Sequence, residues 1–328
     1  MVTDTQPSVR DQGITKIATP PAITTVADPA AKQVSQIAPG RKDAFGNAMA
    51  CPTGTIPMRR MTLEETTRFP SLAAYLGKQP VGTSRPTITP GGPHRYAVGY
   101  QWVNNHGSNS WLNLWNPSGD FTLSQLWDVS SASTTQTLEA GWVHYPAKFG
   151  GSSVLFIFWT PDNYASGCYN LDCSGFVQTS SAATLGAAFS NYSVSGGAQY
   201  GFGLQYKWFQ GNWWLFYSNT ALGYYPGSIY GSGPLASGGA NLVEYGGETY
   251  TAGNNWPQMG SGQFASAGWT FSAFQNTLFY IDTGDVSQWA SLSPIVTNPG
   301  CYTLGIVPAS SGGSWGSYIW FGGPGGNC

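Results

Sequence analysis

Short apolar or alternating segments, not long amphipathic ones, fill most of this chain. After residue 95 they recur between clusters of Gly, Asn, Ser and Pro, and no sustained 3.6-residue period interrupts them. Such segments are typical of strands in a sandwich or barrel. We therefore predict an all-β domain, an antiparallel two-sheet β-sandwich, with strands over Ser110–Trp115, Phe121–Val129, Thr137–Tyr145, Ser153–Thr160, Tyr200–Phe209, Asn212–Tyr217 and Asn276–Ile281.

The same pattern separates the sandwich from what precedes it. Residues 1–50 are rich in Pro, Ala, Thr and Gln without sustained periodicity, which predicts a flexible lead. Residues 79–94 are typical of a linker because they contain Pro80, Pro86, Pro90 and Pro93 together with three glycines. We place the domain boundary in this linker, so the sandwich spans residues 95–328.

Helix signals occur between the lead and the linker, in residues 51–78. Thr62 followed by Glu65 matches a capping box, and the run Ser71–Leu76 ends at Gly77, a common helix stop. One or two short helices are therefore expected in this segment.

Charge is distributed unevenly along the 328 residues. The first 95 residues contain 11 Lys and Arg against six Asp and Glu, whereas the rest contains two against nine, together with all 14 Trp. The predicted sandwich is therefore acidic, and a nucleic-acid partner, which would need a basic surface, is not expected. No apolar run approaches the ~20 residues of a membrane-spanning helix, so we expect no membrane partner.

Five cysteines bear on the cellular compartment. The spacings favour the local disulfides Cys168–Cys173 and Cys301–Cys328, which leave Cys51 unpaired. Disulfides form in oxidising compartments, so we predict a secreted protein, although the opening residues show no signal-peptide pattern. The alternative is a cytosolic protein with five reduced thiols.

Several kinds of catalytic site are poorly supported. Serine catalysis needs a base, and the three histidines, His94, His106 and His144, stand far apart. Gly312–Gly316 matches a nucleophile elbow, but no helix signal follows it. His, Cys and carboxylates are not clustered as metal ligands, so no metal site is expected.

Two carboxylates remain as candidates for catalysis. Glu139 and Glu248 lie in strand-like segments with few charges, and each shares a strand face with a glycine, Gly141 or Gly246. We expect these glycines to leave room for a substrate backbone. Burial raises the pKa of a carboxyl group, and two close carboxyls can share one proton, which is the basis of acid–base hydrolysis. The alternative is that both glutamates are solvated residues on outer strand faces.

Several motifs of residues 96–328 resemble the neprosin family, glutamic-type endopeptidases that cut after proline. Gly167–Gln178, which reads Gly-Cys-Tyr-Asn-Leu-Asp-Cys-Ser-Gly-Phe-Val-Gln, is the most specific. The others occur in the family's order, and they are Ser124–Trp127, Leu138–Trp142, Gly211–Leu215, Leu222–Pro226, Tyr245–Glu248 and Gln258–Gly262.

The resemblance has implications for fold, mechanism and partners. It implies a curved sandwich of two antiparallel sheets with about seven strands each, and no metal or organic cofactor. It places the catalytic pair at Glu139 and Glu248. Residues 51–62 resemble the core of the family's activation segment, which implies a zymogen whose residues 51–94 form the pro-segment and linker. The expected partners are proline-containing peptides and this pro-segment.

A paired-glutamate mechanism leads to further expectations. One glutamate would be ionised to activate water and the other protonated, with the roles left open, and the rate would peak in acid. Gln258 could donate to the oxyanion. The charge contrast would hold the basic pro-segment over the acidic groove until acid weakens it. Because the proline nitrogen has no N–H, its ring must be recognised by packing, for which the candidates are Trp127, Tyr164, Trp213 and Tyr245.

Two other functions fit the composition. A jelly-roll glycoside hydrolase would also use two carboxylates and Trp platforms. A non-catalytic carbohydrate-binding module would use the aromatics alone, for stacking on sugars.

Overall fold

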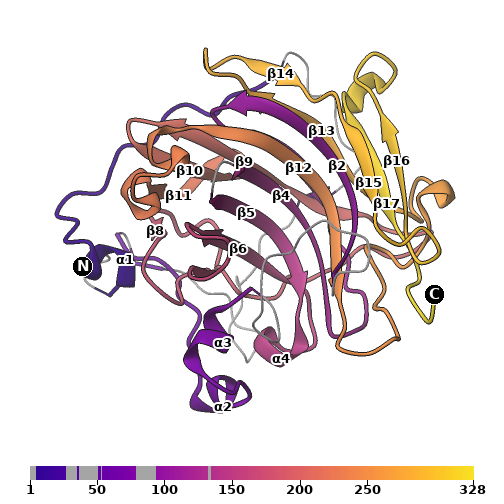
Figure 1. The fold of residues 1–328 in the computed structure, drawn as a ribbon, viewed down its shortest axis with the longest axis horizontal. Helices are drawn as coiled ribbons and strands as arrows, with labels where there is room; N and C mark the ends of the chain where they lie inside the picture. The colour runs from indigo at the N-terminus through magenta and orange to yellow at the C-terminus, as the bar shows by residue number, and fades with distance from the viewer. Residues whose placement is uncertain (1–4, 27–34, 37–50, 53, 79–93, 132–133) are drawn as a thin grey trace.

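The strands form two large sheets packed face to face (Figure 1). This arrangement confirms the predicted all-β sandwich. The computed structural model describes residues 5–26, 35–36, 51–52, 54–78, 94–131 and 134–328. The predicted linker prolines, Pro80, Pro86, Pro90 and Pro93, lie outside these residues.

One sheet has seven strands, in the order β15-β2-β12-β4-β5-β6-β7, and every neighbouring pair is antiparallel. Its long central strands curve together in Figure 1. The strands are β2 (His94–Asn105), β4 (Phe121–Ser131), β5 (Thr135–His144), β6 (Val154–Thr160), β7 (Cys168–Tyr169), β12 (Ala240–Tyr250) and β15 (Ser293–Val296).

The other sheet has ten strands within the described residues. Eight follow the order β16-β17-β13-β3-β9-β10-β11-β8, while β14 pairs with β13 and β1 pairs in parallel with β9. The expected number of about seven therefore describes the first sheet, and the second adds short strands. These strands are β1 (Ser35–Gln36), β3 (Ser108–Asn113), β8 (Val177–Gln178), β9 (Tyr200–Phe209), β10 (Asn212–Tyr217), β11 (Thr220–Pro226), β13 (Ala273–Ile281), β14 (Ser287–Trp289), β16 (Thr303–Val307) and β17 (Tyr318–Gly322).

Hydrophobic clusters cover both faces of the seven-stranded sheet. Side chains alternate along a strand, so Leu138 of β5 faces the ten-stranded sheet and joins a cluster with Tyr206. Trp127 of β4 lies on the other face, in a cluster with Phe69 and Tyr75 of the N-terminal segment. Burial of both faces explains why β6, with the sequence VLFIFWT, reads as an almost continuous apolar run.

Short helices form in the N-terminal segment that contributes Phe69 and Tyr75 to this second cluster. In α2 (Leu63–Thr67), the Thr62 hydroxyl accepts from the Glu65 N–H at 3.2 Å while the Glu65 carboxylate accepts from the Thr62 N–H at 3.0 Å. α3 (Leu72–Leu76) is capped by Ser71 and ends at Gly77, so both predicted helices are confirmed. α4 (Pro146–Phe149) lies near them in Figure 1. Among the described helices, none is long and apolar enough to cross a membrane.

Residues 5–26 differ from the flexible lead that we predicted over residues 1–50. The Gln6 side chain donates to the Gln178 carbonyl at 3.0 Å and accepts from the Gln178 N–H at 2.9 Å. Val9 of α1 (Pro7–Asp11) is buried against Trp214 and neighbouring side chains of the ten-stranded sheet. Composition missed these contacts because the apolar residues that pack against the sheet, Val9, Ile14, Ile17, Ala18 and Ile23, are not spaced with a regular period.

Both predicted disulfides are confirmed. Cys168–Cys173 closes the loop after β7, and Cys301–Cys328 ties the C-terminal residue to the loop before β16. Cys51 is unpaired and partly buried.

One acidic residue is buried between the sheets. Asp128 of β4 is fully buried, and its Oδ2 accepts a hydrogen bond from the Ser108 hydroxyl at 2.7 Å. Burial outweighs this bond and raises the pKa of Asp128 from 3.8 to about 8. Between these two values the folded protein holds a proton that the unfolded chain releases, so stability falls as the pH rises through this window.

We expect Asp128→Asn to flatten this pH dependence. The amide is neutral at every pH, so the loss in free energy of unfolding between pH 4 and pH 7 should shrink by on the order of a few kcal/mol. Urea denaturation at the two pH values measures it. The exposed Asp120→Asn should leave the slope unchanged. An unaltered slope in Asp128→Asn would show that Asp128 is ionised in the folded protein.

Candidate active site

Glu139 of β5 and Glu248 of β12 lie on the same face of the seven-stranded sheet. β4 runs between their strands, where Glu139 is opposite Trp127 and Glu248 is opposite Leu123. Leu123 and Trp127 are four residues apart on β4, so they mark one strand face. Both glutamates are fully buried, which excludes the alternative that they are solvated.

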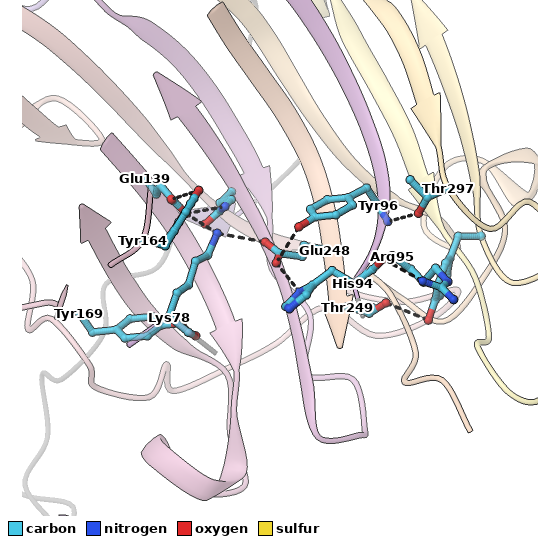
Figure 2. Close-up of polar contacts among 12 residues, drawn as sticks. Lys78, His94, Arg95, Tyr96, Glu139, Tyr164, Tyr169, Glu248, Thr249 and Thr297 are labelled. Atoms are coloured by element: carbon cyan, nitrogen blue, oxygen red, sulfur yellow. Dashed lines mark hydrogen bonds and ion pairs between the residues drawn. The ribbon is translucent and has the colours of Figure 1, made fainter. Parts of the chain in front are cut away.

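Lys78 joins the two glutamates. Its ammonium group contacts Oε2 of Glu139 and lies 3.0 Å from Oε2 of Glu248. Figure 2 shows the lysine reaching between the two carboxyl groups. Since both oxygens lie within hydrogen-bond reach of one nitrogen, they are no more than about 6 Å apart. The sheet therefore brings together two carboxyl groups that are 109 positions apart in the sequence.

The lysine is as deeply buried as the carboxylates. Its side chain is 1% exposed, and its carbonyl oxygen accepts a hydrogen bond from the Tyr169 hydroxyl at 2.6 Å. Burial acts to lower the pKa of Lys78, but Glu139 and Glu248 more than offset burial and raise it. A buried charge is tolerated when it is paired in this way, and removing one partner is costly.

Neutral donors complete the surroundings of Glu139. Its Oε1 accepts from the Thr137 hydroxyl and from the Tyr164 hydroxyl, each at 2.8 Å. Its Oε2 accepts from the Gln125 amide at 2.9 Å. Apart from Lys78, the described partners of this carboxylate are therefore uncharged.

Glu248 has a different environment. The Nδ1 of His94 lies 2.7 Å from its Oε1, and the Tyr96 hydroxyl donates to the same oxygen at 3.3 Å (Figure 2). Burial acts to raise the pKa of Glu248, but Lys78 and then His94 outweigh burial and lower it to about 2. Glu248 is therefore ionised while Lys78 is in place.

A third carboxyl group, Glu244, lies on the same face. It precedes Glu248 by four residues on β12 and is 7% exposed. Burial first, and then the charge of Glu139, raise the pKa of Glu244 to about 7. Glu244 is therefore a neutral acid at acidic pH.

Gly141 and Gly246, the glycines near the pair, do not leave room for a substrate backbone as we expected. A Cβ atom on Gly141 would lie 1.9 Å from the Ser124 carbonyl oxygen, and one on Gly246, whose φ is +147°, would lie 2.2 Å from the Ala97 carbonyl oxygen. These glycines allow the backbones of adjacent strands to approach closely. The space that a side chain would need at each position is filled by the backbone of the neighbouring strand.

Two of the predicted pocket aromatics lie at the pair. Tyr164 is hydrogen-bonded to Glu139, and the Trp127 ring centre is 5.5 Å from the Lys78 nitrogen. A cavity of about 1000 Å³ opens beside Lys78, and Phe158, Trp159 and Tyr164 form part of its wall. The wall of this cavity includes Lys78 but neither Glu139 nor Glu248, so it adjoins the lysine rather than the carboxylates themselves.

The other two predicted aromatics do not reach the pair. Trp213 and Tyr245 are fully buried in the cluster between the sheets. The Trp213 indole donates to the Leu235 carbonyl at 2.8 Å, and the Tyr245 hydroxyl donates to the Phe279 carbonyl at 2.9 Å. Tyr245 follows Glu244 directly on β12, so its side chain points to the opposite face.

Gln258 also lies apart from the glutamates. Its Oε1 accepts from the Ser118 N–H at 3.3 Å, and the contacts of the described residues do not link it to Glu139 or Glu248. The amide at the pair is that of Gln125. Gln125 is two residues before Trp127, and its parity on the predicted strand could have identified it.

Comparison with known proteins gives two findings. The Neprosin family model matches residues 118–324. Among solved structures, one match is a crystal structure of Scytalido-glutamic peptidase with a peptide-based transition state analog. It is 12% identical, the match covers 71% of this chain and 98% of that chain, and the TM-score is 0.38.

Proposed function

Because the chain belongs to the Neprosin family and is thus a peptidase, we propose that it is a glutamic-type endopeptidase that cuts on the carboxyl side of proline. The observation that carries the proposal is the pair of fully buried carboxylates held to one ammonium group on a single sheet face. Once that ammonium leaves, two carboxyl groups this close favour a state with one shared proton.

The shared proton gives each carboxyl group a task. The ionised group takes a proton from water as the water attacks the scissile carbonyl carbon, and the protonated group donates to the leaving nitrogen. Protonation of both groups in strong acid, or ionisation of both at higher pH, stops the reaction. We therefore expect the rate to peak in acid.

A pro-segment formed by residues 51–78 would keep this site inactive. Its Phe69 and Tyr75 pack in the cluster on the glutamate face, and the buried Lys148 donates to the Tyr75 carbonyl. Lys78 fills the space between Glu139 and Glu248 that water and a peptide need. Substrate can enter only after this segment leaves, which makes the full chain a zymogen.

Processing and secretion complete the proposal. The prolines at positions 80, 86, 90 and 93 lie within 15 residues after Lys78, so they offer cleavage sites for the enzyme itself. Cutting there would leave Lys78 on the released fragment. The two disulfides support export to an oxidising compartment.

Recognition of proline would use the apolar side chains at the pair. Tyr164 and Trp127 lie beside the carboxylates, and Phe158 stacks near Tyr164 with ring centres 6.1 Å apart. Such rings can pack against a pyrrolidine ring without needing a hydrogen bond from it. Trp213 and Tyr245 take no part because they lie between the sheets.

Digestion of a proline-rich peptide tests the function. We expect mass spectrometry across pH 2–7 to show cleavage after proline, fastest in acid, and a matched peptide with alanine in place of each proline to be cut at least roughly tenfold more slowly. Equal cleavage of both peptides would contradict proline recognition. Absence of peptide cleavage at every pH, with release of sugar from a glycan, would favour the glycoside hydrolase instead.

A further inference from the structure

His94 is held rigidly beside Glu248. It is the first residue of β2 and is 1% exposed, and its Nδ1 lies 2.7 Å from Oε1 of the glutamate. Three aromatic rings surround the imidazole, with ring-centre distances of 4.9 Å to Tyr250, 6.2 Å to Phe121 and 6.3 Å to Tyr96. The imidazole therefore keeps its position when residues 51–78 leave, because His94 belongs to β2 and none of these rings belongs to residues 51–78.

The contact defines where the imidazole carries its proton. A carboxylate oxygen only accepts hydrogen bonds, so the nitrogen that faces it must bear hydrogen. Nδ1 lies 2.7 Å from Oε1 without hydrogen-bond geometry, and the other ring nitrogen, Nε2, is buried with no hydrogen-bond partner among the described residues. An N–H group this close to a carboxylate oxygen favours the ionised form of the carboxylate.

Few other ionisable groups surround this contact. From β12, Glu248 and Tyr250 face the imidazole, and Tyr96 faces it from β2. Lys78 acts on the opposite oxygen of Glu248. When Lys78 leaves, His94 is the one basic side chain in contact with Glu248 in the part of the chain that the structure describes.

Glu139 would then have no basic side chain in contact with it among the described residues. Its remaining described partners are the Gln125 amide and the hydroxyls of Thr137 and Tyr164. A hydroxyl can turn from donor to acceptor, so these partners tolerate a protonated carboxyl group. The two members of the pair therefore differ in which charge state their surroundings favour.

We propose that His94 is a positioning residue that keeps Glu248 ionised in the processed enzyme, so that Glu248 is the base and Glu139 the acid. The inference rests on the proposed peptidase function. Water gives one proton to Glu248 while its oxygen bonds to the scissile carbonyl carbon. Glu139 then gives its proton to the leaving nitrogen as the C–N bond breaks, and one proton returns from Glu248 to Glu139 to restore the pair.

The pH dependence of His94→Gln tests this role. Without the imidazole at Oε1, Glu248 becomes protonated at a higher pH, so the acid limb of kcat/KM should move up by about one pH unit. On that limb the variant should be about tenfold slower than the wild type, and near the optimum it should be within about threefold. The matched control is His106→Gln, which removes an imidazole 2.9 Å from Asp285 and should leave the limb unchanged.

A structural role for His94 gives a different result. It predicts a lower melting temperature and an equal loss of rate at all pH values, with no movement of the limb. That result, or an unmoved limb in a folded variant, overturns the proposal. His94→Asn serves as the second variant if His94→Gln does not fold.

A titration without turnover separates this inference from the function. The carboxyl of Glu248 can be followed by ¹³C NMR in the full chain carrying Lys78→Met and Glu139→Gln, which cannot cut itself, with its signal assigned by its loss in Glu248→Gln. His94→Gln should raise the pKa of Glu248 by about one unit. An unchanged value overturns the proposal about His94, whereas an inactive wild type with the expected shift overturns the peptidase function alone.

Discussion

Glu139→Gln and Glu248→Gln each lower kcat/KM for a proline-containing peptide by roughly 10³-fold or more. An amide of the same shape can neither accept a proton from water nor give one to the leaving nitrogen, and acid–base catalysis contributes about 10²–10⁴-fold. The double variant should be little worse than either single variant, because the two groups act as a unit. Initial rates measure these effects on variant chains whose pro-segment has been cut off by added wild-type enzyme and removed, because a variant that cannot cut itself would otherwise keep Lys78 in its site.

Glu244→Gln is the matched control for this pair. Glu244 lies on the same strand face as Glu248, and its pKa of about 7 leaves it neutral in acid, where glutamine resembles it closely. Its activity in acid should stay within about threefold of the wild type. Retention of more than a tenth of the wild-type rate by Glu139→Gln or Glu248→Gln would show that the pair is not catalytic.

Lys78→Met should release the full chain from latency. Breaking a buried ion pair by removing one partner costs about 3–5 kcal/mol, so the population with an open site should rise by roughly 10²–10⁴-fold. Activity without acid treatment, and conversion to a shorter form on a gel, should increase in proportion. Combining Lys78→Met with Glu248→Gln should abolish the conversion if the enzyme cuts itself.

The sign of the pH effect follows from Glu248. With Lys78 in place, its pKa falls from 4.5 to about 2, so the closed form is stabilised at higher pH and loses this stabilisation as the pH falls through that window. Wild-type conversion should therefore accelerate below pH 4.5, whereas Lys78→Met should convert with much weaker pH dependence. Arg68→Met, which removes an exposed cation paired with Glu64 in the same segment, should behave as the wild type. A Lys78→Met chain that is as inactive as the wild type before acid treatment would show that Lys78 does not keep the full chain latent.

Strand parity explains where the structure places the predicted site residues. Glu139 and Glu248 were candidates because isolated carboxylates in apolar, glycine-containing strands are rare, and the family resemblance then placed the catalytic pair there. Parity also places Tyr245 on the opposite strand face from Glu244. Tyr245 was nevertheless among the aromatic residues that we expected to pack against the substrate proline. An aromatic count does not distinguish a core ring such as Trp213 from a groove ring such as Trp127, because only packing against the other sheet decides between them.

Lys78 and His94 required the three-dimensional structure. Lys78 comes 61 positions before Glu139 in the sequence, and no spacing rule predicts that a residue just after a helix end inserts between two strands. The contrast of a basic N-terminal part with an acidic domain indicated attraction but not which cation makes the contact. From the sequence, His94 was considered only as a base for serine catalysis. Its pairing with Glu248 could not be predicted, because it depends on the β2–β12 register.

The most direct test of the central claim is a crystal structure of the acid-processed chain with a proline-containing peptide analogue that resists cleavage. The account predicts that Lys78 has left and that the carbonyl of the proline residue lies between Glu139 and Glu248, within about 4 Å of each carboxyl group. A peptide bound elsewhere, with the two carboxylates still closed off from it, would contradict the account.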